Sequence, residues 1–295
     1  MADASGVNKE YKDRLFNFIF GREENKVWTL SLYNAVNGSS YTNPDDITIN
    51  TIREVLYLGM HNDVSFLISG DMNLYEQQST YNPNMPVRML QYAGHLYERY
   101  MDENKLNKYG SEVLSLPVPK LVVFYNGTKY VEDDIILKLS DSFPEGSESD
   151  IEAKVRMINV NYGRSKQTID ACKPLYEYSW LIQTIRDYKK TINEIEKAVD
   201  KAITDMPDDY ILKQFLVTHR AEVNGMLVTE YNEEETMELF KEDGRKEGRK
   251  EGSRIMIYEL VADGDITEKK GAQKLGITIE ELKNNMELTG YKCPS

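Results

Sequence analysis

Three polar side chains near residue 70 have the types and spacing of a site for a hard metal ion. Asp63 lies near the start of one predicted strand, and Glu76 and Gln78 lie two positions apart on the next. Because residues two apart on a strand point to the same side, Glu76 and Gln78 share one face of the sheet. Two carboxylates on adjacent strands, with the backbone carbonyl of Gln77, would suit Mg²⁺ or Mn²⁺, which take oxygen ligands and keep several waters.

Such a site could activate water. A bound metal lowers the pKa of its water and screens the charge of a phosphodiester under attack. Gln78 would lie beside that water or the scissile phosphate, where a lysine would orient the nucleophile and stabilise negative charge. A glutamine can hydrogen-bond to water but cannot act as a general base near neutral pH, so the metal would supply most of the activation.

Each of these residues also has a purely structural interpretation. Asp63 could be a turn aspartate, Glu76 an edge-strand glutamate, and Gln78 a strand glutamine that makes cross-strand hydrogen bonds. The spacing alone leaves both interpretations open.

The elements that would position this site form a mixed α/β layer architecture. Residues 65–80 predict a β-hairpin, with Gly70-Asp71-Met72-Asn73 suited to its turn. Helical spacing predicts helices over 9–20 and 23–36 before the hairpin and a helix over 85–100 after it. The helix over 85–100 has an apolar stripe and a separate polar stripe, which consists of Arg88, Gln91, His95 and Arg99. After it, a continuous apolar run predicts a buried strand within 116–127.

The second half of the chain is mostly helical by its periodicity. We expect two strands within 131–160, a long helix over 167–200 and another near 208–225. The tandem GRKEGRKE that begins at Gly244 predicts a solvated linker or an exposed stretch of helix. In the tail, Thr267 and Thr278 precede two helical runs, and the step between the runs resembles the turn of a helix-turn-helix.

Composition and net charge narrow the class of protein less than the motifs do. Of the 295 residues, 40% are hydrophobic and 29% charged, as in ordinary globular proteins. There is no apolar run of about 18 residues to cross a membrane, no signal-peptide pattern, and only two distant cysteines, so we expect a reduced, cytoplasmic protein. The net charge of −13 taken alone argues against general nucleic-acid binding. However, residues 193–243 hold 14 acidic against 5 basic side chains, which leaves the rest of the chain nearly balanced.

The ordered set of short motifs resembles the PD-(D/E)xK nuclease superfamily, and more narrowly its bacterial transposases of the Rpn recombination-promoting type. The resemblance covers roughly residues 9–250, and its ordered motifs are more specific than the acid pair alone. Its carriers are Lys12-Asp13-x-x-Phe16, Asn62-Asp63-Val64-Ser65-Phe66, Leu74-Tyr75-Glu76-Gln77-Gln78-Ser79-Thr80, Asn82-Pro83-Asn84-Met85-Pro86-x-Arg88, Val122-Val123-Phe124-Tyr125-Asn126-Gly127 and the Glu/Gly/Lys-rich tail.

The resemblance implies a restriction-endonuclease-like αβββαβ core with a helical C-terminal extension, and Mg²⁺- or Mn²⁺-dependent DNA cleavage. Asp63 and Glu76 would bind metal, Asp13 would be the acid of the first helix, and Arg88 would face the DNA. Gln78 takes the position of the superfamily lysine, and an ExQ version occurs in this branch.

The expected organisation has three parts. These are a nuclease-like core over 1–165, a helical extension over 166–243 and a basic, helix-turn-helix-like tail over 244–295. The expected partner is DNA, with no membrane association and with self-association possible through the C-terminal helices. The alternative is a catalytically weak relative that binds DNA or a protein through its tail.

Overall fold

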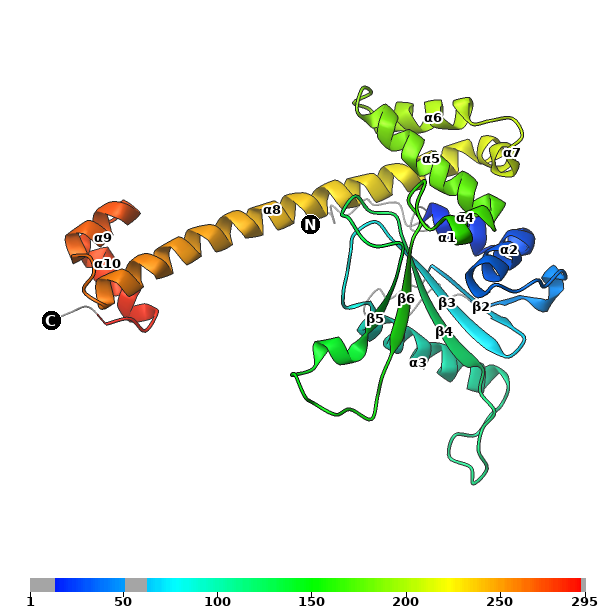
Figure 1. Ribbon diagram of the computed structural model, residues 1–295, viewed down its shortest axis with the longest axis horizontal. Coiled ribbons are helices and arrows are strands. Elements are labelled where there is room, and N and C mark those ends of the chain that lie inside the picture. The colour runs from blue at the N-terminus through cyan, green and yellow to red at the C-terminus, as the bar shows by residue number, and fades with distance from the viewer. Residues whose placement is uncertain (1–13, 51–62, 293–295) are drawn as a thin grey trace, which may run out of the picture. The chain divides into compact units, whose positions relative to one another are not determined.

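The protein is described by a computed structural model that covers residues 14–50 and 63–292. The chain divides into two compact units, Met1–Asn232 and Glu233–Ser295. The first unit is α/β and is built on a mixed six-stranded sheet with the order β1-β2-β3-β4-β6-β5 (Figure 1). The predicted α/β class is therefore confirmed. The three-part division of the chain stays a prediction.

The hairpin lies inside the sheet. Strand β2 (Val64–Ile68) pairs antiparallel with β3 (Asp71–Gln78), with Val64 opposite Tyr75. The predicted turn over 70–73 is wrong, because Ser69 and Gly70 make the turn and Asp71 already belongs to β3. Both turn residues have positive φ, 50° and 84°. Two such residues form the tight turn whose twist matches a hairpin, so the second strand begins at Asp71 instead of after Asn73.

Helix α3 (Met85–Glu103) follows the hairpin and leads into β4 (Val118–Tyr125). Strand β4 pairs parallel with β3 on one side and with β6 (Lys154–Asn159) on the other. The edge strands, β1 (Thr48–Ile49) and β5 (Asp134–Lys138), pair antiparallel with β2 and β6. A parallel β3–β4 pair needs a crossover, and α3 supplies it.

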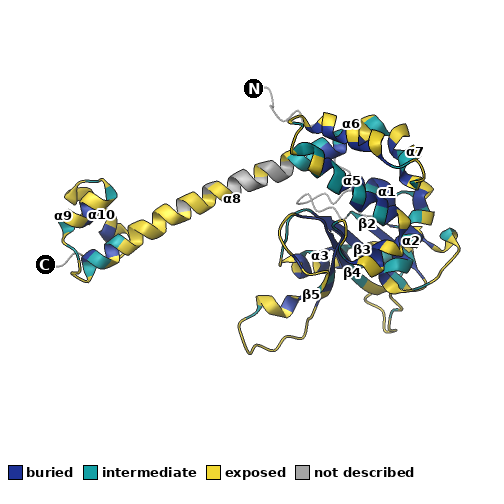
Figure 2. Ribbon diagram, turned by 45° about the horizontal axis from the view of Figure 1, so that its top comes forward, coloured by how far each residue is buried: buried dark blue, intermediate teal, exposed yellow. Residues whose placement is uncertain are grey.

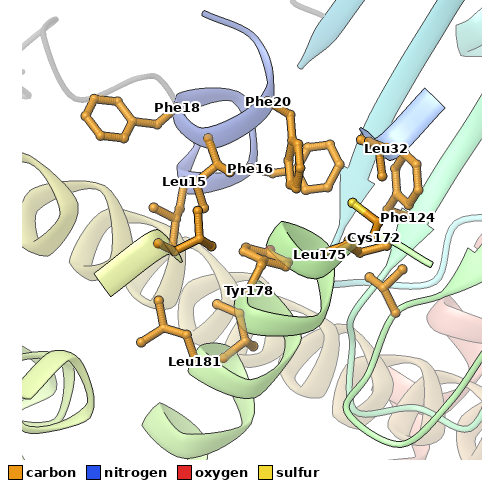
Figure 3. Close-up of a cluster of buried hydrophobic side chains, with 14 of the residues drawn as sticks. Leu15, Phe16, Phe18, Phe20, Leu32, Phe124, Cys172, Leu175, Tyr178 and Leu181 are labelled. Carbon is orange, nitrogen blue, oxygen red and sulfur yellow. The ribbon is translucent and has the colours of Figure 1, made fainter. Parts of the chain in front are cut away.

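The two faces of the sheet are buried by different helices. Met72 and Leu74 of β3 share a hydrophobic cluster with α3, whereas Tyr75 belongs to a second cluster on the opposite face. This alternation along β3 assigns Glu76 and Gln78 to the α3 face. The opposite face packs against α1 (Leu15–Phe20), α2 (Lys26–Asn37) and α5 (Lys173–Lys189), as Figures 2 and 3 show.

The helix expected over 167–200 is instead three helices, so that prediction is wrong. Helix α4 (Lys166–Asp170) ends before an extended Cys172, α5 begins with Pro174 in its first turn, and α6 (Ile195–Asp205) follows a short break. Proline has no N–H to donate and restricts the residue before it, which accounts for the break before α5. Likewise, the helix expected near 208–225 is α7 (Ile211–Thr218) followed by the start of α8 (Arg220–Ala262).

The second unit contains the end of α8 with α9 (Glu268–Leu275) and α10 (Ile279–Leu288). The tandem GRKE repeat lies within α8, which confirms the exposed-helix interpretation. Thr267 and Thr278 cap the two short helices as predicted, and Thr278 forms a capping box with Glu281. Gly276 ends α9 with φ of 67°. None of the helices in the described ranges is long and apolar enough to cross a membrane.

Candidate metal centre

Glu76 is the centre of the candidate site. It lies near the end of β3 and is only 3% exposed. Its Oε1 accepts hydrogen bonds from Arg88 Nη2 at 2.7 Å and from Gln78 Nε2 at 3.2 Å. Its other oxygen, Oε2, is buried and accepts no hydrogen bond from the described part of the chain. A buried carboxylate oxygen without a donor is costly, so this oxygen is well suited to a ligand.

Asp63 is held against the same strand. Its half-buried carboxylate accepts a hydrogen bond from the backbone N–H of Gln77, with 2.6 Å between Oδ2 and the nitrogen. The β2–β3 ladder ends with Val64 opposite Tyr75, so Asp63 lies one residue beyond the last pair, where its negative charge acts on Glu76. The structure therefore brings the two predicted metal ligands together.

The electrostatics of the pair favour a bound cation. Burial raises the pKa of Glu76, and the negative charge of Asp63 raises it further. The positive charges of Arg88 and Arg14 act in the opposite direction without restoring the usual value. The surroundings of Glu76 thus disfavour its ionised form, and a bound divalent cation would offset the cost of that buried negative charge.

Gln78 and Arg88 both contact the glutamate. Gln78 is 7% exposed, and its amide points to Glu76 rather than across the strands. Arg88, in the first turn of α3, also donates to the hydroxyl of Tyr92 at 2.8 Å. Two other members of the predicted polar stripe pair within their own helix instead, His95 with Glu98 and Arg99 with Glu103. Of the predicted stripe, we place Arg88 alone at the site.

The predicted backbone ligand is engaged by a residue that sequence reasoning missed. The carbonyl oxygen of Gln77 accepts a hydrogen bond from Arg14 Nη1 at 2.8 Å. The side chain of Gln77 lies on the opposite face of the sheet, where its amide donates to Asn126, which in turn donates to the hydroxyl of Tyr178. No local signal marks Arg14 beyond its position next to Asp13, the predicted helix acid, which lies outside the described residues.

The residues fit a Mg²⁺- or Mn²⁺-type ion better than a cation that needs many protein ligands. Residues 14–50 and 63–292 contain no group of three or more His, Cys, Asp or Glu side chains placed to hold a metal. Mg²⁺ is commonly held by one or two carboxylates and otherwise by water. Asp63 and the unbonded Oε2 of Glu76 meet that requirement.

No protein-family model, curated protein or solved structure matches the chain. Its function is therefore inferred from the chemistry of this site and from the order of the elements around it.

Proposed function

We propose that the protein is a metal-dependent DNA endonuclease of the PD-(D/E)xK type. One observation carries the proposal: Glu76 is buried beside Asp63 with one carboxylate oxygen left unbonded. A hairpin whose only task was structural would gain stability by replacing such a carboxylate with an apolar residue. A buried carboxylate beside a half-buried one is more typical of a metal site in an enzyme.

The order of the elements supports the same class. Helix α2 is followed by β1, β2 and β3, then by α3 and by β4, which is parallel to β3. This sequence of elements agrees with the αβββαβ core that the motif resemblance implies. The acid pair lies on the hairpin of that core, and the arginine that contacts it lies on the crossover helix.

In this proposal Asp63 and Glu76 hold Mg²⁺ or Mn²⁺. The bound cation would supply an activated water and neutralise charge on the phosphate. Arg88 positions Glu76 through its 2.7 Å ion pair and carries positive charge toward the DNA backbone. Gln78 donates to Glu76 and offers its amide oxygen to a nearby water. A bacterial, cytoplasmic location belongs to the same proposal.

A second candidate function is a DNA-binding relative with little or no catalysis. Two features favour it. Gln78 stands where the resembled family has a lysine, and Arg14 occupies the Gln77 carbonyl that would be a third metal ligand. In this alternative, the arginines near the acid pair would contact phosphates without cleavage.

A plasmid-cleavage assay distinguishes the endonuclease from the DNA-binding relative. Wild-type protein, Asp63→Asn and Glu76→Gln are incubated with supercoiled DNA and Mg²⁺ or Mn²⁺, with Glu103→Gln, an exposed change on α3, as the matched control. Both site variants keep the side-chain size and remove a charged ligand. We expect the wild type and the control to nick or linearise the DNA, and we expect the site variants to lose at least about a hundredfold in rate, roughly 2.7 kcal/mol.

Equal cleavage by all four proteins would show a contaminating nuclease. DNA binding in a gel-shift assay without cleavage by the wild type, with either metal, would favour the binding module. Mn²⁺ soaked into crystals of the wild type, located by its anomalous scattering, tests the ligands independently of activity.

A further inference from the structure

The part of α8 that lies in the second unit has an unusual division of charge. Within residues 233–254, the first eleven residues hold six acidic side chains and one lysine, and the next eleven hold five basic side chains and two glutamates. The acidic half (233–243) therefore carries −5 and the basic half (244–254) +3. All of this segment lies within the part of α8 that belongs to the second unit.

Nothing in the described part of the chain covers the basic half. Every described residue from 242 to 256 is exposed. Lys246 pairs with Glu242 along the helix, whereas Arg249, Lys250 and Arg254 form no ion pair with any described residue. The segment runs for about 33 Å at 1.5 Å per residue.

We propose that this segment is an interface at which a second copy of the chain binds antiparallel. In an antiparallel pair centred near Gly244, the acidic half of each helix lies beside the basic half of the other. In a parallel pair, like charges would face each other along the whole length, which is destabilising. The charge pattern is thus complementary to itself in one orientation only, as a two-fold interface requires.

Two features of the surface suit close approach of a second helix. Gly244, Gly248 and Gly252 recur every four residues, and a Cβ built on any of them meets nothing within 4 Å. A groove of about 520 Å³ also opens beside the basic half, between the end of α8 and α10. Its lining includes Arg254, Ile255 and Leu288, and Leu288 is 84% exposed. In the antiparallel pair, the partner's acidic half runs past this groove, where Arg254 would meet it.

Charge exchange in the full-length protein tests the interface. One variant reverses the acidic half (Glu234→Lys, Glu238→Lys, Glu242→Lys), and another reverses the basic half (Lys246→Glu, Lys250→Glu, Arg254→Glu). A third carries all six changes, so it keeps the net charge of −13 and exchanges the signs of the two halves. Sedimentation equilibrium at low and high salt gives the dimer dissociation constant of each, and circular dichroism reports that the helices are retained.

We expect the wild type to form a dimer that weakens as salt rises, because the contacts are between exposed charges. Each three-residue variant alone should bind itself at least about tenfold more weakly, or ~1.4 kcal/mol. An equimolar mixture of the two three-residue variants should form a heterodimer about as tightly as the wild type forms its homodimer. The six-residue variant should pair with itself, because its two halves again carry opposite charge.

Three results would overturn the proposal. These are a wild type that stays monomeric at low salt, three-residue variants that dimerise as tightly as the wild type, and a six-residue variant that does not pair with itself. None of these measurements depends on nuclease activity, so failure of the interface and failure of the proposed chemistry are distinguishable.

Discussion

Arg14 Nη1 lies 2.8 Å from the carbonyl oxygen of Gln77, the backbone oxygen that the sequence assigns to a metal ion. A guanidinium at this point neutralises part of the acid pair in the metal-free protein and repels an incoming cation. The two sites on the chain are 63 residues apart, so the contact exists only in the folded sheet.

Removal of this charge should tighten metal binding. We expect Arg14→Gln to bind Mn²⁺ about tenfold more tightly than the wild type, or ~1.4 kcal/mol. Isothermal titration calorimetry measures the change, with Arg22→Gln as the control because Arg22 pairs with Glu24 away from the site. Equal affinity in Arg14→Gln and the wild type would mean that the guanidinium does not compete with the metal.

Stability of the metal-free protein should depend on the protonation of Glu76. Its pKa is raised by burial and by Asp63, so the folded state keeps a proton that the unfolded state releases. Stability is then unaffected below the ordinary glutamate pKa and falls as the pH rises above it, until the folded-state pKa is passed. Each unit of difference in pKa corresponds to about 1.4 kcal/mol.

Urea unfolding in EDTA over a series of pH values measures this dependence. Glu76→Gln should flatten the profile and be more stable than the wild type at the alkaline end, whereas Glu103→Gln should follow the wild type. Parallel profiles for all three proteins would show that Glu76 titrates normally in the folded state.

Substitution of Gln78 by lysine should increase catalysis. A lysine at this buried position would place a charge beside Glu76 Oε1, where the amide now donates at 3.2 Å, and would stabilise negative charge on the phosphate. We expect Gln78→Lys to cleave DNA about tenfold faster than the wild type, a change of ~1.4 kcal/mol in activation free energy. Gln78→Met, similar in length and without a donor, should be slower than both. A lysine variant no faster than the methionine variant would exclude position 78 from the chemistry.

Gly127 follows β4 at the point where the chain passes the end of β3. A Cβ here would lie 2.0 Å from the carbonyl oxygen of Ser79 and 2.6 Å from the Tyr125 hydroxyl. Because backbone must move to admit a methyl group, Gly127→Ala should destabilise by roughly 2–4 kcal/mol. Gly94→Ala, in the exposed middle of α3 with open space around it, should instead stabilise by about 0.5–1 kcal/mol. Chemical denaturation of both variants checks the opposite signs.

The local features of the site could be predicted from the sequence because they depend on short-range periodicity. The shared face of Glu76 and Gln78, the approach of Asp63 and the placement of Arg88 on the next helix all follow from a two-residue repeat, a hairpin and a helical repeat. Thr278 and its capping box are likewise written in four consecutive residues.

What the sequence missed depends on contacts between distant segments or on single dihedral angles. Arg14, the residue before α1, donates to the carbonyl of Gln77, and the side-chain amide of Gln77 donates to Asn126, the residue after β4. The predicted hairpin turn over 70–73 lies too far along the chain, because Ser69 adopts a positive φ that serine rarely takes and β3 already begins at Asp71. The break before α5 was signalled by Pro174, but the apolar repeat on both sides of it outweighed that signal.

The number of residues that separates paired strands also predicts the order in which parts of the sheet form during folding. Asp63 and Glu76 are brought together by one hairpin with a two-residue turn at Ser69 and Gly70. Strand β4, in contrast, is separated from β3 by the whole of α3, so the two strands can pair only after this long connection has folded back. Because short loops close before long ones, we expect Asp63 and Glu76 to come together before β3 pairs with β4. The two carboxylates would then be exposed to solvent until α3 packs over them. A dissolved cation would meet the pair at that open stage, and the rate of refolding with and without Mn²⁺ would report the encounter.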